Sequence, residues 1–340
     1  MSLSSRFVAA WYAPHLTALT APLVPLAVAF GAIAFMRRTL YRARLLRVHQ
    51  LPVPVIVVGN ITVGGSGKTP LVAALTRSLA ERGWHPGIVS RGHGRASSRS
   101  TPVIVAPDAD AAEVGDEPLL LARTGIPVAV ATDRVAAARA LLAAHPECNV
   151  IVADDGLQHY RLARDFEVAV VDAARGLGNG WRLPAGPLRE PAKRLDEVDA
   201  TVVLVAPGAS ASWSVPNAWR MTLVGDTFHR VADPAATQPA SAFAGSNVHA
   251  VAGIGNPERF FAQLRSLRIA ATGHALPDHH RFVPADLALP GARAILMTEK
   301  DAVKCSVFAD ERCWYLPVRA HIDPALVARI EEALHGSEAA

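Results

Sequence analysis

A glycine-rich stretch early in the chain has the residue types needed to hold a triphosphate. Residues Gly59–Thr69 read GNITVGGSGKT, directly after an apolar run and before a helical pattern. Glycines let successive backbone N–H groups point into one concavity, and the start of the following helix adds its dipole. In such a P-loop a lysine can neutralise β- and γ-phosphate oxygens, and a hydroxyl can bind Mg²⁺. The ATP-binding residues predicted on this basis are Thr62, Val63, Gly64, Gly65, Ser66, Gly67, Lys68 and Thr69.

The loop departs from the pattern GxxxxGK[ST] at one position, because Thr62 stands where the first glycine belongs. Val63 precedes the glycine pair, where dimerising P-loop ATPases carry a lysine, so that class is set aside. The strand before the loop and the helix after it still favour nucleotide binding.

A second apolar run ends in two carboxylates. Residues 149–158 read NVIVADDGLQ, so Asp154 and Asp155 follow a buried strand. This is typical of a Walker B element, whose aspartates hold Mg²⁺ directly or through water. The alternative is that one aspartate merely caps the turn before Gly156. Gln158 and His159 follow on the same loop, and we expect both near the phosphates.

Asp116 and a group of basic residues are further site candidates. Asp116, in GDEP, could accept the proton of an attacking hydroxyl or could simply cap a helix. Arg91, His93 and Arg95 follow the expected strand Ile88–Ser90, and strand ends face the ligand crevice in open α/β sheets. The two arginines could bind phosphate, or the segment could form a solvated basic turn.

Two later loops carry titratable side chains. Arg189 and Glu190 end the segment LPAGPLRE, and Asp278 precedes His279 and His280. Adjacent histidines rarely converge on one metal ion, and no zinc spacing is present. We therefore expect an acid–base or orienting role for one histidine, without deciding which.

Short apolar strands alternate with helical patterns, which predicts a mostly parallel sheet covered on both faces. The expected strands are Val53–Val58, Ile88–Ser90, Pro127–Ala131, Val150–Ala153, Val168–Val171 and Thr201–Val205, and the expected helices are Lys68–Arg82 and Asp133–Ala144. A Pro-, Ala-, Thr- and Ser-rich junction follows at about residues 232–246. Beyond it, strands at Val248–Ala252, Ala294–Met297 and Trp314–Leu316 and a helix near Pro257–Leu267 predict a smaller α/β unit.

The fold class is thus α/β, with a P-loop NTPase-like sheet. We expect an N-terminal membrane-associated helix with its basic flank in residues 1–48, a core domain in 49–231 and a smaller C-terminal domain in 232–340.

The N-terminal region is apolar and then abruptly basic. No Lys, Arg, Asp or Glu occurs from Phe7 to Met36, and Arg37, Arg38, Arg42, Arg44 and Arg47 follow. About 20 apolar residues suffice to span a bilayer, and flanking arginines stay cytoplasmic. Three prolines in the stretch make a tilted or interfacial helix a serious rival to a full span. A cleaved signal peptide and a buried helix are weaker alternatives, so we expect membrane attachment.

Composition narrows the function classes. The 340 residues are 51% hydrophobic and 19% charged, which indicates a folded chain with room for two domains. A net charge of +4 argues against a dedicated nucleic-acid binder. Cys148, Cys305 and Cys313 show no metal spacing and are expected to be free thiols in a reducing compartment.

Together these segments resemble the tetraacyldisaccharide 4′-kinase family, the lipid A 4′-kinases of Gram-negative bacteria. The matching segments, in chain order, are VVGNITVGGSGKTP, SRGHGR, VGDEP, VADDGLQH, RLPAGPLRE, AGIGNPERFF, PDHHRF and MTEKDAVK. The resemblance implies transfer of the ATP γ-phosphate, with Mg²⁺, to the 4′-hydroxyl of a tetraacyldisaccharide 1-phosphate. The product would be lipid IVA, a lipopolysaccharide precursor. The reaction would take place at the cytoplasmic face of the inner membrane, and no protein partner is indicated.

The resemblance also suggests residue roles. Asp116 resembles the catalytic base, assisted by His279, with Lys68 and Asp155 also catalytic. Thr69, Asp154 and Asp155 would be metal-proximal. The substrate-binding candidates are Arg91, His93, Arg95, Gln158, His159, Arg189 and Glu190, although relatives often carry tyrosine in place of His93.

Two rival functions stay open at this point. A nucleotide-switched binding protein would need an N-K-x-D element for guanine, and Thr298–Asp301 (TEKD) lacks both the asparagine and the spacing. A P-loop kinase of a soluble metabolite would not need the apolar N-terminal region.

Overall fold

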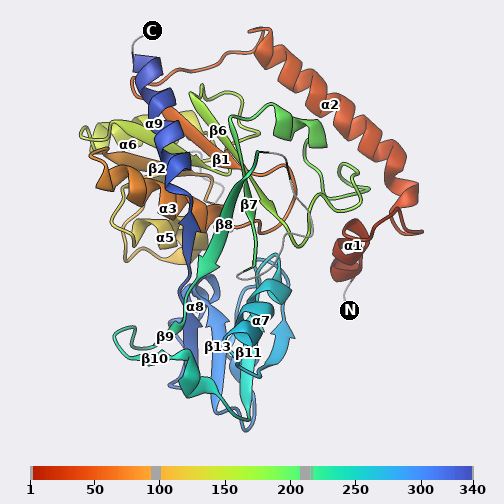
Figure 1. The fold of residues 1–340 in the computed structure, drawn as a ribbon, viewed down its shortest axis with the longest axis vertical. Helices are drawn as coiled ribbons and strands as arrows, with labels where there is room; N and C mark the ends of the chain where they lie inside the picture. Colours follow the sequence, from red (N-terminus) through yellow and green to blue (C-terminus); the bar gives the residue numbers. More distant parts are fainter. Residues whose placement is uncertain (1–2, 93–100, 207–214, 216, 339–340) are drawn as a thin grey trace.

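The computed structural model describes residues 3–92, 101–206, 215 and 217–338, which form two β-sheets and their helices (Figure 1). The strands of the large sheet are β1 (Val55–Gly59), β2 (Pro86–Ser90), β3 (Val103–Ile104), β4 (Val128–Val130), β5 (Val150–Asp154), β6 (Phe166–Asp172), β7 (Ala200–Leu204), β8 (Trp219–Val224) and β15 (Arg319–Ile322). Their order is β15-β8-β7-β6-β1-β5-β2-β4-β3. All neighbours pair in parallel except the two edge strands, β15 and β3. The expected mostly parallel sheet is confirmed.

Helices cover both faces of this sheet. They are α3 (Lys68–Glu81), α4 (Ala111–Val114), α5 (Asp116–Ala122), α6 (Arg134–Ala144) and α9 (Pro324–Glu338). Successive side chains of a strand point to opposite faces. Ile56 and Val58 pack in the core beneath α3, α5 and α9, whereas Val55 and Val57 pack in the core beneath α6. Burial on both faces explains why β1 is an unbroken apolar run.

The smaller sheet lies below the large one in Figure 1. Its strands are β9 (Thr227–Arg230), β10 (Thr237–Pro239), β11 (Val248–Ala252), β12 (Thr272–Ala275), β13 (Ala294–Thr298) and β14 (Cys313–Leu316), in the order β10-β9-β14-β13-β11-β12, with helices α7 (Pro257–Ser266) and α8 (Glu299–Cys305). Strand pairing differs from the expected division of the chain at two places. Strand β9 already belongs to the small sheet, and β15 with α9 returns to the large unit.

The N-terminal apolar region forms two helices, α1 (Leu3–Trp11) and α2 (Val24–Arg42), where the sequence suggested one. Pro14 and Pro22 lie in the break between them, and proline removes a helix hydrogen bond. Pro25 is tolerated because it lies in the first turn of α2. Helix α2 is the expected apolar N-terminal helix, and α1 is a second, shorter helix before it.

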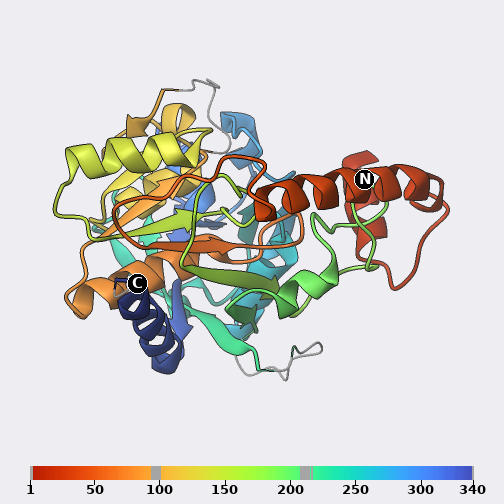
Figure 2. The same ribbon diagram turned by 90° about the horizontal axis from the view of Figure 1, so that it is seen from above.

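Helix α2 runs along the outside of the molecule (Figures 1 and 2). Among the described residues, Ala21–Arg42 is the segment long and apolar enough to cross a membrane, and only 11% of its apolar window is buried. Leu26, Ile33 and Phe35 are 59%, 62% and 71% exposed. Low burial distinguishes α2 from the core helix of a globular protein. In contrast, the end of α1 is attached to the body, where Trp11 Nε1 donates to Pro184 O at 2.9 Å.

Candidate active site

The glycine-rich loop between β1 and α3 has P-loop geometry. Gly64 and Gly67 have φ angles of 98° and 92°, a region that favours glycine. Thr62 instead forms an extended bridge with Leu188, and Val63 N donates to Pro187 O at 2.9 Å. An extended residue needs no glycine, which accounts for the threonine at the start of the motif.

Two cations compensate the charge of Asp155. Lys68 Nζ lies 3.6 Å from Asp155 Oδ1, and Arg189 Nη1 lies 3.1 Å from both carboxylate oxygens. Burial alone would raise the pKa of Asp155, but the lysine and the arginine lower it well below its usual range. Asp155 therefore stays ionised and ties the P-loop lysine to the loop that carries Arg189.

Asp154 is the more deeply buried carboxylate of the pair, at 1% exposure. Ser90 Oγ lies 3.1 Å from its Oδ2, whereas Oδ1 is buried with no hydrogen-bond partner among the described residues. Burial, together with Glu117 and Asp155, raises the pKa of Asp154 to about 7. A buried, unsatisfied carboxylate oxygen beside a P-loop fits a divalent cation, whose charge would replace the proton.

Mg²⁺ commonly takes one or two protein oxygens, with nucleotide phosphates and water as its other ligands. Asp154 and the Thr69 hydroxyl suit that role, and both line the same cleft. In the described part of the chain no group of three or more His, Cys, Asp or Glu could hold a metal by itself. The site therefore fits a cation that arrives with its nucleotide.

Asp116 begins α5 and faces three nitrogen-bearing side chains. The N-cap of α5 is Gly115, so the expectation that Asp116 could be a simple N-cap is not met. Asp116 Oδ2 lies 3.8 Å from His279 Nδ1, 3.7 Å from Lys300 Nζ and 3.4 Å from Lys304 Nζ. This oxygen is buried and makes no hydrogen bond within the described residues. Such a carboxylate can accept a proton from a hydroxyl that enters the cleft.

The two adjacent histidines point to different partners. His279 faces Asp116, whereas His280 Nε2 lies 2.9 Å from Asp286 Oδ2. His279 has a φ of 57°, a left-handed conformation that reverses the chain between the two rings. Of the two, His279 is thus the histidine that lies next to the carboxylate.

Lys300 connects α8 to the start of α5. Its Nζ donates to Glu117 Oε1 at 2.7 Å. Burial would lower the pKa of Lys300, but the carboxylates of Glu117 and Asp116 raise it above its ordinary value. Glu117 shows the converse, because burial would raise its pKa while Lys300 and Lys68 lower it. The described contacts therefore form a charged chain from the P-loop to the small domain.

The small domain also packs directly on the P-loop. Arg259 Nη1 lies 3.2 Å from both Gly65 O and Asp172 Oδ2, and Asn256 Nδ2 donates to Asp172 Oδ2 at 3.1 Å. A Cβ on Gly255 would collide with the backbone nitrogen of Gly65. Backbone contact this close requires glycine on the small-domain side.

A cleft of about 1060 Å³ joins these groups to α2. The P-loop lines it together with Asp154, Asp155, Glu117, His279 and Lys300. Its lining also includes residues of α2 and of the loops beside it, namely Phe30, Gly31, Ile33, Phe35, Arg37, Arg91, Gln158, Arg182, Arg189 and Glu190. Its volume exceeds the range typical for one drug-sized ligand.

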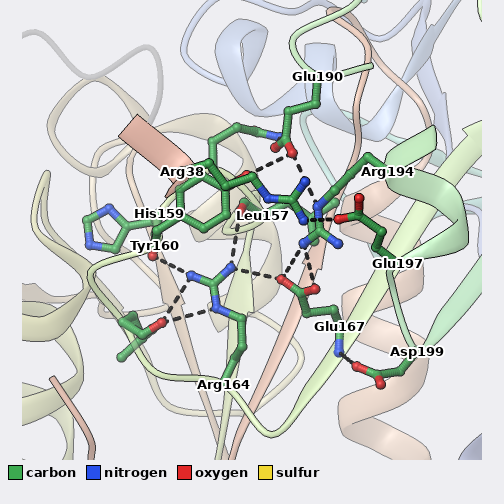
Figure 3. A network of polar contacts seen from close by, with 12 residues as sticks. Arg38, Leu157, His159, Tyr160, Arg164, Glu167, Glu190, Arg194, Glu197 and Asp199 are labelled. Carbon is green, nitrogen blue, oxygen red and sulfur yellow. Dashed lines mark hydrogen bonds and ion pairs between the residues drawn. The ribbon is translucent and has the colours of Figure 1, made fainter. Parts of the chain in front are cut away.

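Glu190 is held by protein groups on both oxygens (Figure 3). Gln158 Nε2 donates to Oε1 at 2.8 Å, and the Tyr160 hydroxyl donates to Oε2 at 2.7 Å. Arg194 Nε lies 3.2 Å from Oε2 and is itself bound by Glu167. Glu190 therefore orients Gln158, and its own oxygens are engaged.

His159 does not reach the cleft within the described structure. Its ring turns toward Asp133, with Nε2 3.5 Å from Oδ1, and it is absent from the residues that line the cleft. Burial and Arg134 lower the pKa of His159 to about 4, so it is neutral. The turn after Gly156 points successive side chains apart, which corrects the expectation that His159 lies near the phosphates. His93 and Arg95 lie outside the described residues.

Sequence reasoning missed the small-domain residues Lys300, Lys304 and Arg259. Both segments lie at strand ends, because MTEKDAVK begins in β13 and GNPERFF follows β11, but nothing local indicates which of their side chains reach the site. Thr298–Asp301 had been considered only as a guanine-binding element. Its actual local role is a helix cap, since the Thr298 side chain accepts from Asp301 N.

A parallel α/β sheet, a P-loop, a buried acidic strand end and an opposing carboxylate define a P-loop phosphotransferase. The tetraacyldisaccharide-1-P 4′-kinase family model matches residues 19–335, and the chain belongs to this family. The chain is 58% identical over 316 residues to a tetraacyldisaccharide 4′-kinase of Azoarcus sp., covering 92% of both chains. It is 48% identical to one of Xanthomonas euvesicatoria, covering 96% of this chain and 94% of the relative.

The fold is also similar to a crystal structure of LpxK from Aquifex aeolicus in complex with ATP. The TM-score is 0.76 at 28% identity, with 93% of this chain and 99% of that chain covered. The comparison supports the assignment of the glycine-rich loop to a nucleotide-binding fold.

Proposed function

We propose that this chain transfers the γ-phosphate of ATP to the 4′-hydroxyl of a tetraacyldisaccharide 1-phosphate, forming lipid IVA. The proposal rests chiefly on one observation: His279, which lines the same cleft as Lys68 of the P-loop, lies 3.8 Å from Asp116. Asp116 and Lys68 would then contact the two reactants of a single displacement.

In this reaction the 4′-oxygen bonds to the γ-phosphorus while the bond from that phosphorus to the β–γ bridging oxygen breaks. ADP leaves, and Asp116 takes the hydroxyl proton with His279 beside it. Lys68 neutralises phosphate oxygens, and Lys300 and Lys304 hold the carboxylate in place. Mg²⁺, held by Asp154 and Thr69 with Asp155 nearby, would neutralise developing charge on the phosphates.

The lipid acceptor explains the exposed helix α2. Moving an acyl chain into water costs about 0.8 kcal/mol for each CH₂, so the enzyme must meet its acceptor at the bilayer. We place α2 at the cytoplasmic face of the inner membrane, with its apolar face in lipid. Arg38 and Arg42 bind Glu197 of the core domain, which would keep the cleft at headgroup level.

The test is phosphate transfer from [γ-³²P]ATP to a tetraacyldisaccharide 1-phosphate in detergent micelles. Asp116→Asn should lower kcat by about 10²–10⁴-fold while nucleotide binding is retained, and Lys68→Met should lose nucleotide affinity. Asp108→Asn, at an exposed position, is the matched control. Label that stays in ATP or appears only as free phosphate in the wild type would refute the proposal.

A further inference from the structure

The residue that follows helix α1 makes direct contact with the nucleotide loop. The hydroxyl of Tyr12 donates to Val63 O at 3.0 Å. Val63 lines the cleft, whereas Tyr12 is not among the described residues that line it. The N-terminal segment therefore contacts the backbone of the P-loop from outside the cleft.

This hydrogen bond fixes the orientation of one peptide group. In a planar trans peptide, the carbonyl oxygen and the N–H of the next residue point in opposite directions. Since Val63 O points to Tyr12, the N–H of Gly64 points away from Tyr12. Gly64 lines the cleft, and this orientation suits an N–H that binds phosphate there.

The Val63–Gly64 peptide depends on such a partner because glycine leaves it free to rotate. A peptide group turns over through ψ of the residue before it and φ of the residue after it, and glycine permits both signs of φ. Gly64 has a φ of 98°. On its other side Val63 is held by the bond from its N to Pro187 O at 2.9 Å. The bond from Tyr12 is thus the contact that opposes rotation of the following peptide.

Arg175 packs on the ring of Tyr12 and lies beside the same peptide. Its Cζ is 4.7 Å from the centroid of the ring, which is a cation–π contact. A Cβ built on Gly64 would lie 3.4 Å from Arg175 Nη1. Burial raises the pKa of the Tyr12 hydroxyl, although Arg175 acts in the opposite direction. The hydroxyl therefore stays protonated and donates its hydrogen.

The end of α1 is held against the loop that follows β6 (Figure 1). Trp11 Nε1 donates to Pro184 O at 2.9 Å, and Asn179 N donates to Trp11 O at 2.8 Å. A Cβ on Gly178, which has a φ of 61°, would collide with Trp11 O. These contacts fix the position of Tyr12, the next residue along the chain.

We infer that Tyr12 is a positioning residue of the P-loop, which holds the Val63–Gly64 peptide in its phosphate-binding orientation while Arg175 packs on its ring. The N-terminal segment then has a second role besides carrying α2, because it sets the affinity for nucleotide phosphates. Donors that are already oriented need no rearrangement when the ligand binds. The inference goes beyond the proposed function, since it concerns the nucleotide loop and not the lipid acceptor.

The experiment measures nucleotide binding to the full chain in neutral detergent micelles, without acceptor. Tyr12→Phe keeps the ring and removes only the hydroxyl, and the matched control is Tyr315→Phe on β14, whose ring stacks on His229 in the small domain. We expect Tyr12→Phe to bind ADP and a non-hydrolysable ATP analogue about 3- to 10-fold more weakly, the size of one hydrogen bond. Tyr12→Leu should lose more, because Arg175 then loses the ring as well.

Adenosine separates an effect on phosphate binding from a distortion of the whole site. Its affinity, measured by competition, should be the same for Tyr12→Phe and the wild type, because it has no phosphate for the Gly64 N–H to bind. Wild-type affinity of Tyr12→Phe for ADP and for the analogue would overturn the inference. An equal loss for adenosine would also overturn it, since the hydroxyl would then support the site as a whole.

Phosphate transfer to the micellar acceptor is measured separately. Tyr12→Phe should raise the KM for ATP by the same factor and leave the KM for the acceptor unchanged. A change confined to the KM for the acceptor would assign Tyr12 to lipid binding and overturn the inference. Wild-type enzyme that binds nucleotide but does not phosphorylate the lipid would instead refute the proposed function, while the binding comparison would still decide the role of Tyr12.

Discussion

Individual carboxylates in this cleft differ in charge state because their surroundings differ. Asp155 is ionised between Lys68 and Arg189, whereas the buried Asp154 has a pKa raised to about 7. The unsatisfied Oδ1 of Asp154 is the oxygen that a cation can bind. Adjacent positions in the sequence thus acquire separate roles from burial and from neighbouring charge.

The raised pKa of Asp154 predicts a pH-dependent stability. Between its unfolded value near 4 and its folded value near 7, the folded state binds the extra proton, so stability falls as pH rises through that window. Asp154→Asn should therefore raise the Tm of the metal-free protein at pH 8 by several degrees, at about 2–4 °C for each kcal/mol. At pH 5 it should change the Tm little.

Thermal unfolding with and without Mg²⁺ and a non-hydrolysable ATP analogue checks this. The ligands should stabilise the wild type more than Asp154→Asn at pH 8. The control is Asp108→Asn, at an exposed position. Asp165 would not serve as a control, because its carboxylate accepts a hydrogen bond from Val55 N. Equal Tm values for wild type and Asp154→Asn at pH 8 would contradict the assigned protonation.

Lys300 contacts the carboxylates of Glu117 and Asp116, so we expect it to position them. Lys300→Met should lower kcat by roughly 10- to 100-fold with little change in the KM for ATP, and Lys300→Arg should restore part of kcat. Exposed Lys193→Met is the control. A loss confined to the KM for ATP would assign Lys300 to nucleotide binding instead.

The sequence predicted those site residues that lie in local motifs. The P-loop and the strand ending in Asp154 were recognisable because strand, turn and helix are contiguous there. Lys300 and Lys304 could not be assigned, because only the packing of α8 on α5 brings them to Asp116. The prediction that His159 lies near the phosphates was wrong, because residue spacing alone does not determine where a side chain points in a tight turn.

At the scale of elements, α2 is a helix with most of its apolar surface unburied. The exposed residues Leu26, Val28 and Met36 do not line the cleft. Replacing all three with glutamine should weaken binding to vesicles, because each buried side chain contributes about 1.5–3 kcal/mol. Activity on acceptor dispersed in detergent should persist.

Vesicle co-sedimentation and the micellar assay, run in parallel, measure the two properties. Polar replacement of exposed residues elsewhere, such as Val307→Gln, is the control, since Val307 is 92% exposed on the small domain. Unchanged sedimentation of the triple variant would contradict membrane binding through α2.

The parallel strands were predictable as apolar runs, whereas their partners at the sheet edge were not. The antiparallel strand β15 comes from the end of the chain and pairs with β8. Its four residues RAHI carry no pattern that identifies a distant partner. The break between α1 and α2 was signalled by prolines, but their effect on helix number required the structure.

At the scale of the whole molecule, the small domain packs on the P-loop of the large domain. Gly255 contacts Gly65, and Arg259 bonds the same glycine and Asp172. Gly255→Ala should separate these backbones and lower kcat/KM for ATP by about tenfold or more. Gly336→Ala is the control, because a Cβ there meets nothing within 4 Å. A Gly255→Ala enzyme with wild-type kinetics would show that this contact is not needed during catalysis.

The reaction of this family places the phosphate of ATP on one particular hydroxyl of its lipid acceptor, the one at C4′. The most direct measurement is ³¹P–¹H correlation NMR of the lipid product made by the wild-type enzyme. We expect a new phosphorus signal coupled to the proton at C4′ in the wild-type product, and no such product from Asp116→Asn. A new phosphate at any other position, or the C4′ signal from Asp116→Asn at the wild-type rate, would contradict it.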